Sequence, residues 1–242
     1  MPVLEIFGPT IQGEGMAIGR KTMFVRTAGC DYRCVWCDSA FTWNGSGKEE
    51  IRLLHPDAIW EELYRLGGSS FDHVTLSGGN PALLRPLGEL VRLLREKNIR
   101  TAVETQGSIW QDWILEVDEV TLSPKPPSSG MDTDLARLDV WVQRLSDRTG
   151  SASVPDFSLK VIVFDEMDLD YAGLIHRRYP LVPMFIQTGN PMTTEEAITD
   201  VASRLLVSYE HLINQVMKRS DMANVRVLPQ LHTLVWGNKR GV

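Results

Sequence analysis

The chain has 242 residues, 43% of them hydrophobic, which suits one domain over residues 1–242 with a buried core. Twenty-five basic and thirty-one acidic residues leave a net charge of −6, which argues against a protein that coats nucleic acid. No apolar run approaches the roughly 20 residues of a membrane span. The opening residues Met1–Glu5 lack the basic start of a signal peptide, so we expect a cytoplasmic protein.

Short β-rich runs alternate with amphipathic stretches along the chain. The predicted strands are Met23–Thr27, His73–Ser77, Arg100–Glu104, Glu119–Ser123, Ser158–Phe164, Pro183–Gln187 and Val225–Leu228. Helical spacing of apolar residues predicts helices over Leu84–Lys97 and Thr194–Lys218, and Pro56 and Gly67 suit the two ends of a third. Strands that alternate with helices favour parallel βα units, closed or half-closed into a barrel.

Two segments interrupt this alternation. Ser123–Gly130 contains three prolines and a glycine and must be a loop, and Thr149–Pro155 is a polar connector too short to prove a domain boundary. In an α/β barrel the loops after the strands carry the site. We therefore look for function in Ala28–Ser39, Gly78–Pro81, Ser123–Lys125 and Gln187–Asn190.

The three cysteines of the chain stand together as C-x₃-C-x₂-C, directly after a predicted strand: Cys30, Cys34 and Cys37. An odd number of cysteines within eight residues is a poor disulfide framework and a good set of soft ligands for zinc or an iron–sulfur cluster. A structural zinc ion needs four ligands. The fourth would have to be a histidine distant in sequence: His55, His73, His176, His211 or His232.

This cysteine spacing resembles that of the radical S-adenosylmethionine superfamily. The resemblance implies a modified partial (β/α) barrel and a [4Fe–4S] cluster on the three thiolates, with one iron open to S-adenosylmethionine. It also places Trp36, the aromatic residue before the third cysteine, and Cys37 and Asp38 beside that cofactor. The cluster and S-adenosylmethionine would supply the reactivity, and the protein would supply orientation and a dry pocket.

Two glycines follow the next predicted strand, in Ser77-Gly78-Gly79-Asn80-Pro81. Glycines allow a backbone to approach a ligand closely, although a plain βα turn would have the same composition. The segment resembles the superfamily's glycine-rich motif for the amino group of S-adenosylmethionine, with Asn80 in the place of the usual Glu. Backbone contacts through Gly78 and Gly79 tolerate that change, whereas a carboxylate contact does not.

Further motifs resemble the 7-carboxy-7-deazaguanine synthase family: the Q-G-E-G loop, the arginine at the end of the following strand, and Cys37-Asp38-Ser39. The resemblance implies radical ring contraction of 6-carboxy-5,6,7,8-tetrahydropterin with loss of ammonia, in queuosine or deazapurine biosynthesis. Amide and carboxylate groups suit a pyrimidinone edge, and Arg26 can grip a carboxylate with two hydrogen bonds. The substrate residues that it implies are Ile11, Gln12, Gly13, Glu14, Arg26 and Ser77, with His232 near the C-terminus as a further candidate beside Gln230.

The same resemblance implies a Mg²⁺ ion on the hydroxyl of Ser39, where the family commonly has Thr. Mg²⁺ prefers hard oxygen ligands, but a Ser after a turn is also a common helix cap. The implied contacts of S-adenosylmethionine beyond the cysteine loop are Gly79, Ser123, Pro124, Lys125, Gln187, Thr188, Gly189 and Asn190.

Other readings stay open at this point. A glycyl-radical activase is another small radical enzyme, but it acts on a protein and has no need of the Q-G-E-G loop with Arg26. A zinc- or cluster-stapled binding module would not be an enzyme at all.

For the enzyme we expect an electron donor such as flavodoxin or ferredoxin, and a homodimer. Tryptophans in helical patterns (Trp110, Trp113, Trp141) and the acidic run at Asp165–Asp170 are read as packing residues and a solvated helix start.

Overall fold

The computed structural model describes residues 1–147, 156–191 and 198–242. Within these ranges one sheet has the strand order β3-β1-β2-β4-β5-β6-β7-β8-β9. The bounds are β1 Pro2–Ile11, β2 Lys21–Thr27, β3 Arg52–Leu53, β4 His73–Gly78, β5 Arg100–Thr105, β6 Glu119–Leu122, β7 Asp156–Val163, β8 Met184–Thr188 and β9 Arg226–Leu228. From β2 to β9 all neighbours pair in parallel, whereas β1 pairs antiparallel with β2 and β3.

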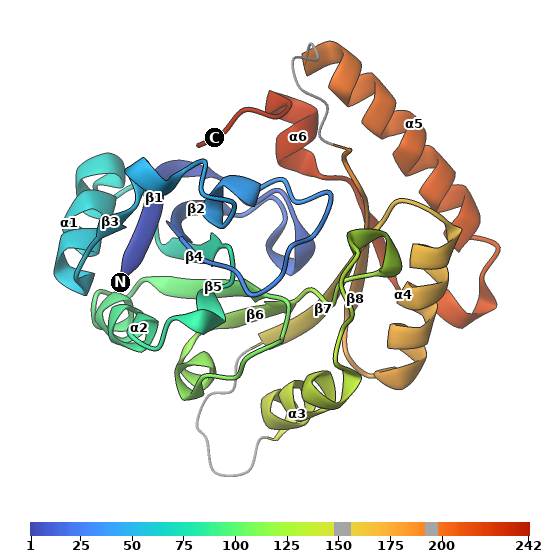
Figure 1. Ribbon diagram of the computed structural model, residues 1–242, viewed down its shortest axis with the longest axis horizontal. Helices are drawn as coiled ribbons and strands as arrows, with labels where there is room; N and C mark the ends of the chain where they lie inside the picture. The colour runs from blue at the N-terminus through green and yellow to red at the C-terminus, as the bar shows by residue number, and fades with distance from the viewer. Residues whose placement is uncertain (148–155, 192–197) are drawn as a thin grey trace.

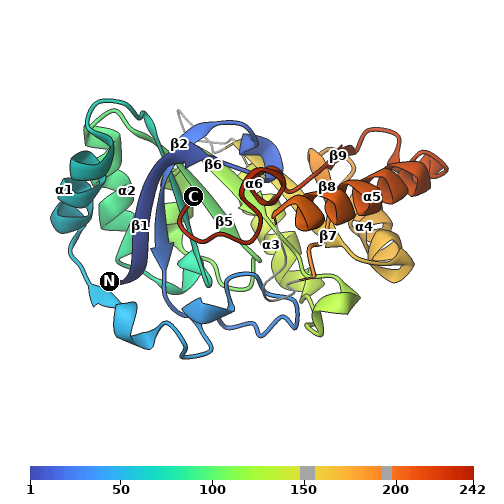
Figure 2. The ribbon, with the colours of Figure 1, turned by 90° about the horizontal axis from the view of Figure 1, so that it is seen from above.

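The helices connect these strands and lie around the curved sheet (Figures 1 and 2). Their bounds are α1 Pro56–Gly67, α2 Leu87–Glu96, α3 Leu135–Ser146, α4 Glu166–Arg178, α5 Ile198–Val216 and α6 Leu231–Trp236. Each parallel pair needs a crossover that returns the chain to the starting edge of the sheet. Helices make most of these crossovers, and a 3₁₀ segment, Asp112–Glu116, joins β5 to β6. The carboxyl ends of β2 and β4–β8 therefore gather on one side. The result is the predicted partial (β/α) barrel, which Figure 1 shows as an open curved sheet.

All seven predicted strands are present with small shifts at their ends, and α1 has the predicted bounds. Helix α2 begins at Leu87 and not at Leu84, because Pro86 stands at its N-cap and Leu84 ends a preceding short 3₁₀ turn. Helix α5 confirms the predicted Thr194–Lys218 helix from Ile198 to Val216, two residues short of the predicted end. The predicted connector Thr149–Pro155 lies outside the described residues.

The apolar faces predicted for the helices pack against the sheet. Ile59 and Leu63 of α1 and Leu87, Val91 and Leu94 of α2 are fully buried in one core cluster. Burying one such side chain contributes about 1.5–3 kcal/mol. These contacts fix the outer side of the sheet and leave its strand ends to carry the loops.

The tryptophan interpretation is confirmed. Trp141 is 1% exposed and Trp113 is 5% exposed, both within the core cluster. Trp110 packs edge-on against Trp141 with ring centroids 4.7 Å apart.

The acidic run after β7 is a helix start, as predicted, but it is not solvated throughout. Asp165 caps α4 by accepting a hydrogen bond from the Asp168 N–H. Asp168 itself is completely buried, and its carboxylate accepts hydrogen bonds from the backbone N–H groups of Ser128 and Phe164. The carboxylate thus ties the Ser123–Gly130 loop to the end of β7, a role that composition alone does not reveal.

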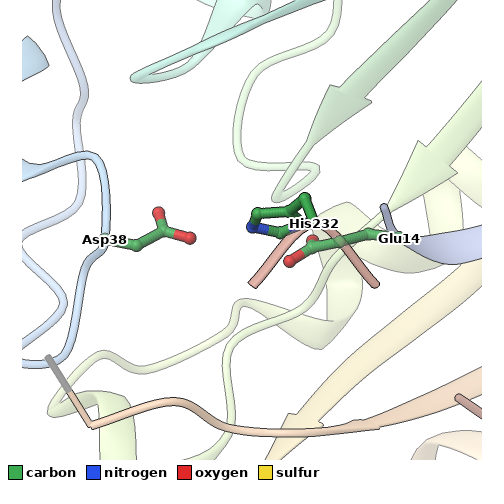
Figure 3. Close-up of side chains that lie close together, drawn as sticks. All are labelled: Glu14, Asp38 and His232. Atoms are coloured by element: carbon green, nitrogen blue, oxygen red, sulfur yellow. The ribbon is translucent and has the colours of Figure 1, made fainter. Parts of the chain in front are cut away.

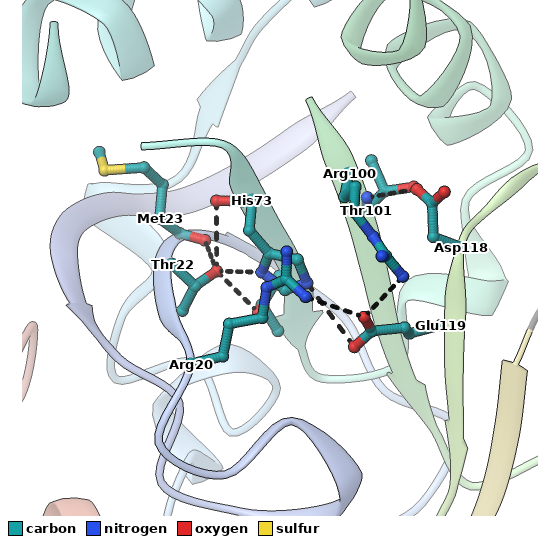
Figure 4. Close-up of polar contacts among 9 residues, drawn as sticks. Arg20, Thr22, Met23, His73, Arg100, Thr101, Asp118 and Glu119 are labelled. Carbon is teal, nitrogen blue, oxygen red and sulfur yellow. Dashed lines mark hydrogen bonds and ion pairs between the residues drawn. The ribbon is translucent and has the colours of Figure 1, made fainter. Parts of the chain in front are cut away.

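Polar side chains meet at the starts of the parallel strands, where Figure 4 shows them around Glu119. The Glu119 carboxylate lies 3.1 Å from Arg100, 3.4 Å from Arg20 and 3.8 Å from His73. On its other side the His73 ring lies 2.8 Å from the Thr22 hydroxyl. This cluster occupies the sheet edge opposite to the cysteine loop and the loops after β4 and β6. No helix in the described ranges has the length and apolarity to cross a bilayer.

Candidate active site

One pocket opens at the carboxyl ends of the strands and gathers residues from the whole length of the chain. Its lining includes most of the predicted site residues: Ile11, Gln12, Gly13, Glu14, Arg26, Cys30, Cys34, Trp36, Cys37, Asp38, Ser39, Ser77, Gly79, Ser123, Lys125, Asn190 and His232. Most of these segments lie at or after the carboxyl end of a parallel strand, and these ends gather at one edge of the sheet. Strand β1 runs antiparallel to β2, so Ile11–Glu14 enter the pocket from the side where β2 starts. The structure thus joins the motifs into one site.

The cysteine loop follows β2 and presents its thiols among N–H donors. Cys30 Sγ accepts hydrogen bonds from the Tyr32 backbone N–H at 3.4 Å and from the Gln106 amide at 3.7 Å. The indole N–H of Trp43 donates to Cys37 Sγ at 3.4 Å. Such donors stabilise negative charge on sulfur, so the loop is suited to thiolate ligands.

Burial has the opposite effect on the free thiols. It raises the pKa of Cys30 and Cys37, and it raises the pKa of Cys34 to about 11. Thiolates in this loop therefore need a positive partner, and a bound metal ion or cluster deprotonates its thiol ligands outright.

The three cysteine sulfurs are not as close to one another as the ligands of a single ion are. In the described part of the chain, the group of three His, Cys, Asp or Glu ligand atoms close enough for one ion is Glu14, Asp38 and His232. This disfavours a zinc ion held by the thiols. A cluster with several irons, each on its own thiolate, fits their separation better.

Glycines bring the end of β4 against the cysteine loop. A Cβ at Gly79 would lie 2.0 Å from the Gly29 carbonyl oxygen and 3.0 Å from Cys30 Cβ. Gly78 adopts φ +127°, and a Cβ there would lie 2.1 Å from the Thr27 oxygen. Both positions require glycine, because any side chain would push the two loops apart.

Asn80, the residue that replaces the family's usual Glu, is completely buried and fully engaged. Its amide donates to Asp31 at 2.9 Å and to Ser108 at 3.0 Å, and its oxygen accepts from Thr105 at 2.8 Å and from the Ala82 N–H. Asn80 therefore connects the cysteine loop with β5. These hydrogen bonds use both the amide nitrogen and the amide oxygen, and Asn80 is not part of the pocket lining.

Trp36 and the loop after β6 form the wall next to Cys37. The Trp36 indole donates to Ser128 at 2.9 Å, and its ring packs against Phe164 with centroids 5.2 Å apart. The Lys125 ammonium donates to Ser123 Oγ at 3.0 Å and lies 6.0 Å from the centre of the Trp36 ring. An aromatic face with hydroxyl and ammonium groups beside it suits a nucleoside.

The loop after β1 carries Glu14, whose two carboxylate oxygens have different partners. Gln230 donates to Oε1 at 2.7 Å, and the Lys160 ammonium bonds to Oε2. Burial by itself raises the pKa of Glu14, but Lys160, His232 and the hydrogen bonds lower it to about 2. Gly13 precedes it because a Cβ there would lie 2.2 Å from His232 Nδ1.

Figure 3 shows Glu14 and His232 on one side of the pocket and Asp38 facing them. One ligand atom from each lies within 4.8 Å of the others, which leaves the polar edge of a small molecule room to meet all three. Proximity is the sole sign of a cation among them, so we assign them no metal. Ser39 lies beside Asp38 and donates to its carboxylate at 3.0 Å. Ser39 stands at the N-cap position of a short 3₁₀ turn without a capping side-chain bond.

Four predicted cofactor residues lie outside the pocket lining: Pro124, Gln187, Thr188 and Gly189. Gln187 is completely buried; its amide donates to the Pro229 carbonyl at 3.0 Å and accepts from the Gly15 N–H at 3.2 Å. A Cβ at Gly189 would lie 2.3 Å from the Phe164 ring. In the described structure these residues hold the wall, and Asn190 is the member of the segment that reaches the pocket.

Several lining residues were missed by sequence reasoning, among them Phe7, Phe24, Glu104, Gln106 and Lys160. Phe7 and Phe24 stack with centroids 4.8 Å apart, and the Arg26 guanidinium lies 5.2 Å from the Phe7 ring. Phe7 was missed because β1 was not predicted. Lys160 had a visible signal, a lysine in the middle of an apolar strand, where charged residues are rare without a partner.

Comparison with known proteins agrees with this geometry. Residues 24–125 match the model of the radical SAM superfamily. Two curated relatives named 7-carboxy-7-deazaguanine synthase are similar along their whole length. The one from Bacillus cereus is 57% identical over 100% of this chain and 99% of its own, and the one from Bacillus subtilis is 53% identical over 100% and 98%. The crystal structure of QueE from Escherichia coli superposes with a TM-score of 0.62 at 22% identity, over 96% of this chain and 94% of that one, which is a likeness of fold.

Proposed function

The chain belongs to the 7-carboxy-7-deazaguanine synthase family of radical S-adenosylmethionine enzymes, and from this premise we propose how its pocket works. The enzyme converts 6-carboxy-5,6,7,8-tetrahydropterin to 7-carboxy-7-deazaguanine with loss of ammonia, in queuosine or another deazapurine pathway. The observation that carries this assignment is full-length identity of 57% to a relative of that name. The pocket agrees with it, because the cysteine loop and Arg26 face the same cavity.

The enzyme uses a [4Fe–4S] cluster and S-adenosylmethionine. The donor set fits them: three free cysteines on one loop, N–H groups directed at two of the sulfurs, and a glycine wall that any Cβ would fill. Cys30, Cys34 and Cys37 would hold the cluster. When bound, the two cofactors supply the radical that takes a hydrogen atom from the substrate. Trp36, Asp38, Gly79, Ser123, Lys125 and Asn190 would hold the nucleoside and amino-acid parts of S-adenosylmethionine.

The substrate would lie between the loop after β1 and the end of β2. Gln12 and Glu14 offer amide and carboxylate groups to its pyrimidinone edge, and Arg26 offers a planar fork to its carboxylate. In the structure the Arg26 guanidinium bonds to Glu5 at 2.5 Å and lies 5.3 Å from the Phe41 ring. These contacts hold the guanidinium in place before substrate arrives. Ser77 and His232 complete the proposed contacts.

A Mg²⁺ ion would bind beside Ser39. The Ser39 hydroxyl is a hard oxygen donor at the pocket wall, and Mg²⁺ keeps several waters and accepts one or two protein ligands with substrate oxygens. Held by Ser39, the ion would supply a positive charge that helps to orient the substrate.

We propose that the enzyme works in the cytoplasm with an external one-electron donor such as flavodoxin or ferredoxin. It would be a homodimer. Helix α5 exposes Leu206 and Val207, and Met217 follows them, and a second copy could cover these apolar side chains. Light scattering after gel filtration would measure the oligomeric state.

Anaerobic reconstitution tests the assignment. The purified chain is loaded with iron and sulfide, reduced, and incubated with S-adenosylmethionine and the tetrahydropterin. We expect 7-carboxy-7-deazaguanine and ammonia in equal amounts, measured by mass spectrometry and an ammonia assay. A glycyl-radical activase would instead modify a partner polypeptide and leave the pterin unchanged, and a binding module would produce neither result.

A further inference from the structure

The most deeply buried charge in the pocket is the ammonium of Lys160. Its side chain is 2% exposed, and it stands on β7 between Leu159 and Val161, which are both fully buried. The ammonium bonds to two carboxylates, that of Glu14 in the loop after β1 and that of Glu104 on β5. One lysine therefore joins segments that are 146 and 56 residues away in sequence.

This arrangement is expensive for the fold. Moving an ammonium and two carboxylates out of water costs several kcal/mol per ion, and apolar residues of similar volume would often be as stable or more so. Lys160 is therefore poorly explained as a stabilising residue. Its position in the pocket lining, with both carboxylates in the same lining, points to a role in ligand binding.

The triad has an excess of one negative charge, because one ammonium faces two carboxylates. Glu14 is also fixed from its far side by Gln230. Each carboxylate oxygen can accept two hydrogen bonds, so acceptor capacity remains after Lys160 and Gln230 have bonded. A negative, oriented carboxylate is complementary to two parallel N–H donors on one planar edge.

A 2-aminopyrimidinone ring has such an edge, since its exocyclic amino group and the neighbouring ring N–H both donate. A ring with a carbonyl in place of the amino group would direct an oxygen at the carboxylate. Sites built to bond an N–H or O–H discriminate strongly against an analogue that lacks it, because the buried partner is then left unpaired.

We propose that Lys160 is a positioning residue that sets the specificity of the pocket: it separates and orients the Glu14 and Glu104 carboxylates so that Glu14 reads the 2-amino group of the pterin. This inference rests on the proposed function. Without the ammonium, the two carboxylates would face each other unshielded, and Glu14 would leave the orientation that meets the ring.

The test is the binding of two oxidised probes to the reconstituted holoenzyme with S-adenosylmethionine and no reductant. The probes are 6-carboxypterin and 6-carboxylumazine, which has an oxo group in place of the 2-amino group, and calorimetry measures both. We expect the wild type to prefer the pterin by about 100-fold, the effect of one lost hydrogen bond to a charged group. Lys160→Met should bind the pterin at least about tenfold more weakly and lose most of the preference.

A double variant separates charge balance from packing. Lys160→Met with Glu104→Gln removes the facing carboxylate together with the ammonium, so Glu14 is again held by Gln230 without repulsion. We expect most of the affinity and preference to return, to within about fivefold of wild type. Lys218→Met, at an exposed lysine just after α5, is the matched control and should leave both values unchanged.

Each outcome supports or overturns the positioning role of Lys160. Unchanged preference in Lys160→Met, or a folded double variant that does not recover, would overturn the proposal. If Lys160→Met alone fails to fold, recovery in the double variant still supports the proposal. If both fail to fold, Lys160 acts in folding and the proposal is wrong. A wild-type holoenzyme that neither binds the pterin nor converts the tetrahydropterin would refute the proposed function itself.

Discussion

Single substitutions in the cysteine loop should have the largest effect on activity. Replacing Cys30, Cys34 or Cys37 by Ala should abolish turnover and lower the iron content, because each thiolate would hold one iron. The fold should survive, since the core cluster lies on the outer side of the sheet and contains none of the three cysteines. Iron content, melting temperature and product formation measure these effects.

Val35→Ala is the matched control for this loop. Val35 lies between Cys34 and Trp36, is 78% exposed and is absent from the pocket lining, so the variant should keep both iron and activity. Full activity in any one of the three cysteine variants would remove that cysteine from the cluster.

Arg26 tests the grip on the substrate carboxylate. Arg26→Lys replaces a planar fork by a point charge, so one of two parallel hydrogen bonds is lost. A hydrogen bond to a charged group contributes about 1.5–3 kcal/mol, so kcat/KM should fall about 10- to 100-fold. Arg85→Lys, at an exposed position before α2, should not change it. Kinetics that are equal in Arg26→Lys and wild type would place the carboxylate elsewhere.

Ser39 tests the magnesium proposal. Ser39→Ala removes the proposed oxygen ligand, so the concentration of Mg²⁺ needed for half-maximal activity should rise by about tenfold. Chelation should lower the activity of the wild type, and added Mg²⁺ should restore it. The proposal would fail if chelated enzyme kept its full rate.

At the scale of residues, the sequence predicted the site through motifs whose members are close in the chain. The cysteine loop, the glycines after β4 and the Q-G-E-G loop are local signals. Glu104 belongs to no such motif, and Lys160 shows only as a lysine within an apolar strand. Their partnership exists only after β5, β7 and the loop after β1 have met in space. Asp168 was misread for the same reason: its partners, Ser128 and Phe164, are supplied by the fold.

At the scale of elements, the cluster around Glu119 connects the N-terminal ends of β2, β4, β5 and β6. The His73 ring is the main cause that holds the pKa of Glu119 below its usual 4.5, with Arg20 and Arg100 adding to it. A lowered pKa means that the ionised carboxylate stabilises the fold above about pH 4.5. The contribution is lost as pH falls through the lowered value.

Glu119→Gln should therefore destabilise the enzyme at neutral pH by about 1–3 kcal/mol, because His73, Arg20 and Arg100 lose their partner. For a chain of this size that is a fall in Tm of about 2–4 °C per kcal/mol. The difference from wild type should shrink as the pH is lowered below 4.5. Melting curves of both proteins between pH 7 and pH 3 measure it, and a difference that does not depend on pH would show that the charge has no role.

The elements also show which sequence signals are reliable. The parallel strands were found because each is a short apolar run followed by turn residues. Strand β1 was missed because Gly8-Pro9 interrupts its alternation, and the register of its pairing with β2 shifts there. Strand β3 has two residues and no apolar pattern, and both are exposed. Its pairing with β1 depends on tertiary structure.

At the scale of the whole molecule, the sheet brings the end of β2, the end of β4 and the loop after β6 to one pocket. Trp36, Gly79 and Lys125 line it together, so the fragments of S-adenosylmethionine can stay bound while the substrate rearranges. The ring contraction with loss of ammonia involves no net oxidation of the substrate skeleton. A hydrogen atom taken at the start could therefore be returned at the end, and we predict that S-adenosylmethionine is not consumed.

The most direct measurement uses tetrahydropterin deuterated at C6 with the reduced holoenzyme. It counts 7-carboxy-7-deazaguanine against released 5′-deoxyadenosine and analyses recovered S-adenosylmethionine by mass spectrometry. We predict many molecules of product for each 5′-deoxyadenosine released, with deuterium in the recovered S-adenosylmethionine. One 5′-deoxyadenosine released for every product, or no 7-carboxy-7-deazaguanine from an enzyme with a full cluster, would contradict the account.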